Sequence, residues 1–287
     1  MKNKIVWLVL AFFCLLPVLS GAATVKLIIK GGLNYSSIGD WNTYLQYWDG
    51  YNKRYYSQHG YTATGGLNPL HFGPAIEAEL RLNIAPRLAV SIGVEYLIAQ
   101  HPAEEMPLTG KAPDGQVVSS RDDISKLSAI PLKITLAYYP LESGRFKAFV
   151  KAGAGYYFAR FRETTIFDAA LSSNFERTQG ANSGGIGFHG GLGVEIGMGG
   201  PLSFLAELEA RHAKISGFEG NGTWKEASGA SGNWSGRLYY YEWLQSEWTT
   251  FVFIEEKEPA GVNYRNVRDA AVDFSGVALK AGFILRF

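Results

Sequence analysis

Apolar and polar positions alternate with a period of two along eight segments of the chain. Successive side chains of a β-strand point to opposite faces, so this alternation predicts strands with one apolar and one polar face. In the last segment, residues 272–287, Leu279 and Phe283 share the apolar face, whereas Lys280 and Arg286 lie on the other. Cations are costly in hydrocarbon, so the two faces need different surroundings. The other predicted strands span residues 25–36, 72–84, 87–99, 129–139, 146–162, 185–198 and 202–215.

The connections between these strands alternate between short and long. The short ones, residues 85–86, 140–145 and 199–201, contain the proline and glycine that turns favour. An even number of strands with this alternation is typical of transmembrane barrels, in which short periplasmic turns alternate with longer extracellular loops. The sequence therefore predicts an all-β fold, a single antiparallel up-and-down transmembrane β-barrel of about eight strands. The long connections span residues 39–70, 100–128, 163–184 and 216–271.

Two alternatives to this arrangement stay open. Residues 237–243 and 249–254 form either a hairpin above the membrane or two further spanning strands, which would make ten. A soluble β-sandwich with a solvated polar face also fits the alternation. The sandwich does not explain why short and long connections alternate along the chain, so we favour the barrel. Aromatic residues near the strand ends would form its interfacial girdle: Tyr96, Tyr138, Tyr156 and Phe287.

The N-terminus has the pattern of a secretory signal peptide. Lys2 and Lys4 precede an apolar run over residues 5–19, and small residues follow at 20–23. We expect cleavage after Ala23, with Ala22 as the alternative, so that residues 1–23 are removed and residues 24–287 form one barrel domain. The only cysteine, Cys14, lies inside the peptide. The mature chain is thus expected to have no disulfide, no thiolate nucleophile and no cysteine-ligated metal, and we expect no cofactor.

Composition narrows the choice of partner. The chain has 27 Lys and Arg against 26 Asp and Glu, which gives no electrostatic reason to expect a nucleic-acid partner. The mean hydropathy is −0.04 although 47% of the residues are hydrophobic, as expected where two unlike faces average out.

The C-terminal strand adds a resemblance to a known group of proteins. A strand that carries Phe283 and Leu285 and ends on the aromatic Phe287 resembles the assembly signal of bacterial outer-membrane barrels. With its alternation and loop parity, the mature chain resembles the small outer-membrane barrel superfamily, which includes the OmpA transmembrane domain, OmpX and OmpW. The resemblance implies a location in the bacterial outer membrane, with outer-membrane lipids, the assembly machinery and periplasmic chaperones as partners. We expect a monomer.

The polar faces carry charges of both signs. A barrel of about eight strands has an interior only wide enough for side chains, and an unpaired charge there is costly, so we expect an ion-paired plug. In this plug the charged residues of segment 77–81 should meet those of segment 207–211 across the lumen. The alternative is a cation-rich, anion-selective narrow pore. The predicted lumen network comprises Glu77, Glu79, Arg81, Glu95, Lys133, Lys151, Glu195, Glu207, Glu209, Arg211, Lys280 and Arg286; Lys26, Lys30 and Lys147 share its face.

The long connections are rich in aromatic residues. Residues 40–57 have helical spacing, with Asp40 as the expected N-cap of a short amphipathic helix at the barrel mouth or on the outer leaflet. Exposed aromatic residues in such numbers either pack together or meet a ligand. The recognition candidates are Trp41, Tyr44, Trp48, Tyr51, Trp224, Trp234, Tyr240 and Trp243.

Three functions are compatible with these patterns. The first is a non-enzymatic outer-membrane barrel with a structural or surface-interaction role and an unknown external ligand. The alternative, which the resemblance to OmpW implies, is a narrow pore for small or hydrophobic molecules. The third is a lipid A-modifying enzyme, but the five histidines are scattered and no zinc motif occurs, so we expect no catalytic or metal-binding residues.

Overall fold

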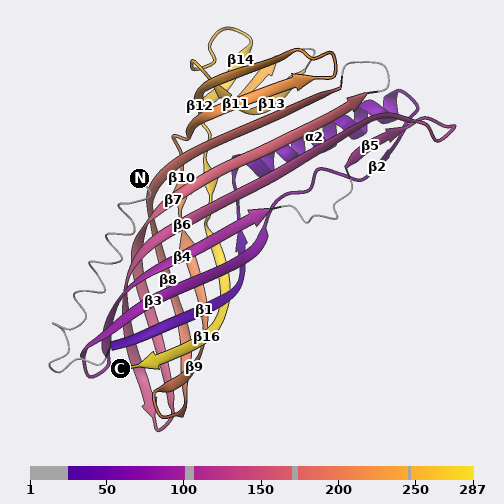
Figure 1. Cartoon of the computed structure of the whole chain (residues 1–287). Coiled ribbons are helices and arrows are strands. Elements are labelled where there is room, and N and C mark those ends of the chain that lie inside the picture. Colours follow the sequence, from indigo (N-terminus) through magenta and orange to yellow (C-terminus); the bar gives the residue numbers. More distant parts are fainter. Residues whose placement is uncertain (1–24, 101–106, 170–173, 245–246) are drawn as a thin grey trace.

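The computed structural model describes residues 25–100, 107–169, 174–244 and 247–287 (Figure 1). The expected signal peptide, residues 1–23, lies outside the described residues. Within the described part of the chain, no helix has the length and apolar character needed to cross a membrane.

Eight antiparallel strands pair in a ring, each with two neighbours (Figure 1). The ring closes between the first and last strands, in a register that runs from Lys26 opposite Arg286 to Ser36 opposite Gly276. This arrangement confirms the predicted all-β antiparallel fold with a ring of eight strands. In ring order the strands are β1 (Val25–Ser36), β3 (Phe72–Ala85), β4 (Leu88–Gln100), β6 (Val117–Ser143), β7 (Phe146–Ala169), β8 (Phe175–Gly199), β9 (Leu202–His212) and β16 (Gly276–Arg286).

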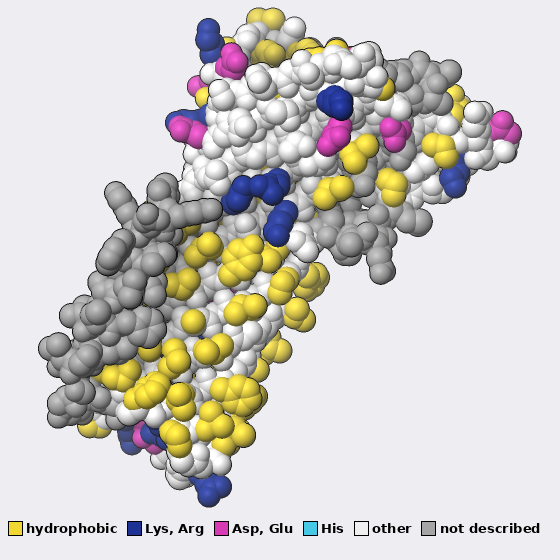
Figure 2. Space-filling view, viewed as in Figure 1, with side chains coloured by type: hydrophobic (Ala, Val, Ile, Leu, Met, Phe, Trp, Pro, Cys, Tyr) yellow, Lys and Arg dark blue, Asp and Glu magenta, His cyan; other side chains and the backbone are white. Residues whose placement is uncertain are grey.

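The outer wall of the ring is apolar. Leu33, Ile134 and Leu279 are 68%, 61% and 67% exposed, whereas the polar residues next to them in sequence are buried inside: Asn34, Lys133 and Lys280. Figure 2 shows apolar side chains covering the lower wall of the molecule. A soluble barrel or sandwich would bury its apolar face, so the polarity is that of a membrane barrel. We call this surface the apolar belt; it includes Ile29, Leu33, Ile76, Ile92, Val94, Leu132, Ile134, Leu136, Val150, Phe188, Leu192, Leu208, Leu279 and Phe283.

Three strands continue past the apolar belt into a second part, which we call the head. The predicted strands 129–139, 146–162 and 185–198 were too short, because β6 begins at Val117, β7 ends at Ala169 and β8 begins at Phe175. Period-two alternation continues there, and the inward faces pack on a helix instead of on a lumen. The head also contains α2 (Asp40–Gln58), β2 (Thr62–Thr64), β5 (Leu108–Lys111), β11 (Glu219–Glu226), β12 (Ser231–Leu244), β13 (Trp248–Glu255) and β14 (Tyr264–Asp269).

Pairing in the head decides between eight and ten spanning strands. The C-terminal half of β8 pairs with β9, whereas its N-terminal half, in the head, pairs with β11. Strand β11 in turn pairs with β12. The β12–β13 hairpin therefore extends the sheet above the ring and adds no spanning strand. A small sheet of β10 (Lys214–Ile215) and β15 (Val272–Asp273) joins the two levels.

Helix α2 forms where the aromatic spacing predicts it, but its first residue acts differently from the prediction. Asp40 is inside the helix, the cap position belongs to Gly39 with φ 65°, and no side chain caps the helix. The Asp40 carboxylate instead accepts hydrogen bonds from the Ala271 amide at 2.8 Å and from Arg268. This pairing fixes the start of α2 to the segment leading into β16. Trp41 then packs edge-on against Phe161 at 4.9 Å, so the first turns of α2 close the upper end of the lumen.

A glycine in β8 makes room for the aromatic packing at the lower end of the lumen. A Cβ added at Gly193 would lie 2.5 Å from Phe149 Cζ and 2.6 Å from the Ala206 carbonyl oxygen. We expect Gly193→Val to destabilise the barrel by about 1–3 kcal/mol, because Phe149 and the β9 backbone must move. Urea unfolding in lipid vesicles measures the change. Gly180→Val is the matched control, since its nearest contact would be an ordinary 3.8 Å.

Candidate functional site

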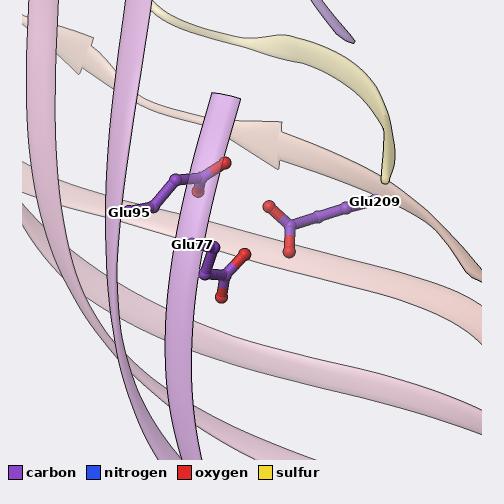
Figure 3. A group of neighbouring side chains, drawn as sticks. All are labelled: Glu77, Glu95 and Glu209. Atoms are coloured by element: carbon purple, nitrogen blue, oxygen red, sulfur yellow. The ribbon is translucent and has the colours of Figure 1, made fainter. Parts of the chain in front are cut away.

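The centre of the lumen is a cluster of three carboxylates from three strands. Figure 3 shows Glu77 from β3, Glu95 from β4 and Glu209 from β9 turned toward one another. One carboxylate oxygen from each lies within 4.8 Å of the other two. Carboxylates this close repel unless a cation lies among them. Such spacing also suits a metal ion. The positions of the neighbouring cationic side chains therefore decide between a metal site and an ion-pair cluster.

Two lysines lie among these three carboxylates and contact each of them. The Nζ atom of Lys133 lies 2.8, 2.9 and 3.3 Å from oxygens of Glu77, Glu95 and Glu209. The Nζ atom of Lys280 lies 2.8, 2.6 and 2.9 Å from oxygens of the same three residues. Each ammonium therefore contacts all three carboxylates, and these protein cations take the place that a metal would need. The geometry is that of an ion-pair centre, which we call the central cluster.

The ion pairs continue along the lumen in both directions. Lys30 lies 2.9 Å from Glu79 and 2.8 Å from Glu207. Lys151 lies 3.0 Å from Glu207 and 2.5 Å from Glu209, which joins β7 to β9. Arg81 bridges Glu79 and Glu195, each at 2.8 Å, and Lys26 lies 3.2 Å from Glu195.

The signs in this network balance. Six cations (Lys26, Lys30, Arg81, Lys133, Lys151 and Lys280) face six carboxylates (Glu77, Glu79, Glu95, Glu195, Glu207 and Glu209). All eight strands of the ring contribute, and every member is buried. Because buried charges are tolerated only when paired and hydrogen-bonded, the balance explains how so polar a lumen can fold.

Apolar layers close the network at both ends. Below it, Phe149, Leu205 and Ile284 form a buried cluster with Tyr139. The Tyr139 hydroxyl donates to Glu195 at 2.6 Å and accepts from Arg81 at 2.8 Å, so it joins the apolar layer to the charges. Above the network, Tyr157 and Phe161 belong to the large core cluster that also contains Trp41.

Three residues of the predicted inward set lie outside this network. Arg211 has no ion pair among the described residues; it donates to the Phe274 carbonyl at 2.8 Å and to Asn34 and Ser36. It lies higher, where β16 begins and no carboxylate faces it. Arg286 donates to Ser203 at 2.7 Å, near the lower end. Lys147 lies at the β6–β7 turn and pairs with Glu142 in solvent. The alternation of polar and apolar residues predicted correctly that these three side chains lie on the inward face of their strands. It did not predict where along the barrel axis they lie.

The head contains a cavity of about 520 Å³ between α2 and the inner faces of β6, β7, β8 and β13. We call it the aromatic chamber. Its walls are mostly aromatic, and the ring of Trp48 contacts those of Tyr44 and Phe251 edge to face. It is lined by Tyr44, Trp48, Tyr51, Asn52, Tyr55, Tyr56, Tyr61, Val118, Ser119, Arg121, Thr165, Phe167, Phe175, Arg177, Phe251 and Phe253.

Two arginines form the polar side of the aromatic chamber, and each has its own carboxylate. Arg121 lies 2.8 Å from Asp123, and Arg177 lies 2.9 Å from Glu163. Arg121 also donates to the Tyr44 hydroxyl at 2.8 Å, and its guanidinium lies 4.6 Å from the Trp48 ring centre. The chamber is therefore close to neutral overall, with hydrogen-bonding groups on one wall and ring faces on the others.

The pKa shifts of Tyr44 and Arg121 both favour the protonated form of the side chain. Burial raises the pKa of the Tyr44 hydroxyl, although Arg121 and Arg177 beside it act in the opposite direction. Burial alone would lower the pKa of Arg121, but Asp123 and Tyr44 together outweigh burial and hold that pKa above its ordinary value. Near neutral pH, Tyr44 is thus an uncharged hydroxyl and Arg121 a cation.

The structure separates the aromatic recognition candidates into three groups. Tyr44, Trp48 and Tyr51 line the aromatic chamber. Trp41 and Tyr240 are buried in the core, and Trp243 stacks on Tyr264 at 6.3 Å. Trp224 and Trp234 lie elsewhere in the head, each against a glycine of the neighbouring strand, Gly232 and Gly222. Sequence reasoning missed Arg121 and Arg177 as chamber residues; the alternation of Arg121, Asp123 and Ser125 was a signal that β6 continues.

No protein-family model and no curated protein matches the sequence. Among solved structures, a major outer membrane protein from Thermus thermophilus is similar, with a TM-score of 0.44 at 12% identity over 93% of this chain and 100% of that one. OprG from Pseudomonas aeruginosa has a TM-score of 0.38 at 13% identity over 91% and 95%. The outer membrane protease OmpT from Escherichia coli has a TM-score of 0.32 at 6% identity over 92% and 96%. All three are bacterial outer-membrane proteins.

Proposed function

We propose that this protein is a non-catalytic barrel of the bacterial outer membrane that binds an external small molecule in the aromatic chamber of its head. The apolar belt supports the membrane location, because its exposed side chains match hydrocarbon on every strand of the ring. The observation that carries the binding role is the cavity of about 520 Å³, which has ring faces on most walls and polar groups on one.

The lumen supports a surface role over transport. Its side chains cross-link all eight strands through buried ion pairs, with apolar layers above and below. An ion crossing it would have to separate pairs that have no water to replace them. We therefore assign the lumen to stability and the head to recognition.

The chemistry of the aromatic chamber favours an uncharged ligand with a flat apolar face and hydroxyl groups. Both arginines are already paired with carboxylates, so a ligand anion would gain little net charge complementarity. Tyr51 and Phe253 offer ring faces, and the side chain of Asn52 offers hydrogen bonds. A sugar ring or a phenyl glycoside has both features.

A phenyl glycoside tests the proposal directly. In lipid nanodiscs, we expect p-nitrophenyl β-glucoside to quench tryptophan fluorescence saturably, because its nitrophenyl group absorbs the emission of Trp48 in the aromatic chamber. Tyr51→Ala should weaken the apparent affinity about tenfold through loss of one stacking wall. Trp48→Phe should remove most of the quenching amplitude.

The matched control is Trp224→Ala. It removes a tryptophan of the head that does not line the aromatic chamber, so the affinity should not change. Quenching that never saturates, or that Tyr51→Ala leaves untouched while Trp224→Ala lowers it, would contradict binding in the chamber.

A further inference from the structure

Three exposed cations lie together on the outer wall, just above the apolar belt. Lys126 on β6 faces Arg162 on β7, and Arg160 lies two residues closer to the belt. The next outward pair down the wall, Ile130 opposite Phe158, is apolar and exposed. Figure 2 shows Lys and Arg side chains gathered at the boundary between the apolar wall and the head. We call Lys126, Arg160 and Arg162 the basic cluster.

The basic cluster has no anionic partner in the part of the chain that the structure describes. In the described residues, none of its three members has an ion pair or a side-chain hydrogen bond. Glu219, which faces Asn182 across the β8–β11 pair, is held by Arg237 at 3.3 Å. Like charges directly opposite each other on neighbouring strands are destabilising. Lys126 and Arg162 are such a pair, so an external anion would relieve a repulsion that the fold itself leaves in place.

A hollow beside the cluster supplies further hydrogen-bond donors. Arg160 and Arg162 line a cavity of about 210 Å³ on the wall formed by β7, β8 and β11. Asn182, Thr178 and Thr223 also line it and offer amide and hydroxyl groups. Guanidinium forks bind phosphate oxygens through paired hydrogen bonds, and hydroxyl and amide donors complete such a site.

The position of the basic cluster along the barrel axis indicates which kind of molecule would supply a bound phosphate. Arg160 is two residues beyond Phe158, roughly 7 Å along the strand. Side chains that begin this close to the end of a hydrocarbon-facing wall lie at the level of lipid headgroups. We infer that the basic cluster and its hollow bind the phosphate of an anionic lipid in the leaflet around the head. This inference rests on the proposed membrane location, but it does not depend on the aromatic chamber.

Lipid association in a bilayer tests the inference. Spin-labelled phosphatidic acid and phosphatidylcholine are compared for their association with the refolded protein in phosphatidylcholine bilayers. We expect selectivity for phosphatidic acid of roughly fivefold for each engaged cation, falling with added salt. The double variant Arg160→Gln/Arg162→Gln should lower the selectivity to about fivefold, the contribution of Lys126 alone, while the barrel keeps its heat-shifted gel mobility.

The control separates a site from general electrostatics. Arg87→Gln/Arg145→Gln also removes two exposed arginines, but from the turns at the other end of the barrel. Most of the selectivity should persist in this variant, and an equal fall in both double variants would overturn the inference. Inorganic phosphate titrated into the protein in phosphatidylcholine nanodiscs should give no saturable heat. Saturable heat that Arg160→Gln/Arg162→Gln removes would assign the hollow to soluble phosphate and also overturn the lipid assignment. A protein that fails to enter bilayers would refute the membrane location itself.

Discussion

Replacing Lys280 with methionine should destabilise the barrel by about 3–5 kcal/mol, because it leaves buried carboxylates without a counter-charge. Lys280 contacts Glu77, Glu95 and Glu209 within 2.9 Å, and its ammonium is fully buried. In the variant, six carboxylates would face five cations, and only Lys133 would remain in contact with all three residues. The free energy of unfolding, measured by urea titration in lipid vesicles, reports the loss.

A second substitution shows whether lost pairing is the cause. Glu95 pairs only with Lys133 and Lys280 among the described residues, so Lys280→Met/Glu95→Gln restores equal numbers of each sign. We expect the double variant to recover stability, with an interaction free energy of at least ~1 kcal/mol in the mutant cycle. Losses that simply add would mean that packing, and not charge, holds the central cluster. Lys147→Met, at the exposed turn pair with Glu142, should change stability by no more than about 0.5 kcal/mol.

The ring could be predicted from sequence because each spanning strand separates an apolar wall from a polar lumen. Lys133 between Leu132 and Ile134 shows this separation within three residues, and the structure places the lysine inside and its neighbours outside. The same rule made pairing in the lumen a reasonable expectation. It could not assign partners, because the height of a side chain depends on the stagger between strands. Arg211 was therefore grouped with carboxylates that lie below it.

The head was harder to predict, because the outer face of its strands is exposed to solvent and the inner face packs against other elements of the head. Arg160 is exposed on the outer face there, while Arg121 is buried against α2, so a charged side chain no longer indicates which face of the strand a residue lies on. The aromatic chamber takes its walls from five elements that are far apart in the chain. Asp40, expected as a helix cap, is used by Arg268 and Ala271, more than two hundred residues away. Contacts of this kind have no local signal in the sequence.

Planar bilayers containing the folded protein should show no single-channel current, whereas Arg81→Ala/Glu195→Ala should produce discrete steps. Arg81 and Glu195 form a fully buried pair at 2.8 Å that joins the charged network to the apolar layer around Tyr139 and Phe149. Removing both keeps the signs balanced, opens space there, and leaves Lys26 without its carboxylate, so water should enter to hydrate it. The turn variant Lys147→Ala/Glu142→Ala also removes an ion pair and should stay silent, since that pair lies in solvent. Heat-shifted gel mobility confirms folding in each case. Steady current through the folded wild-type protein would contradict a closed lumen and favour the narrow pore, in which the lumen cations would then be the residues to test for ion selectivity.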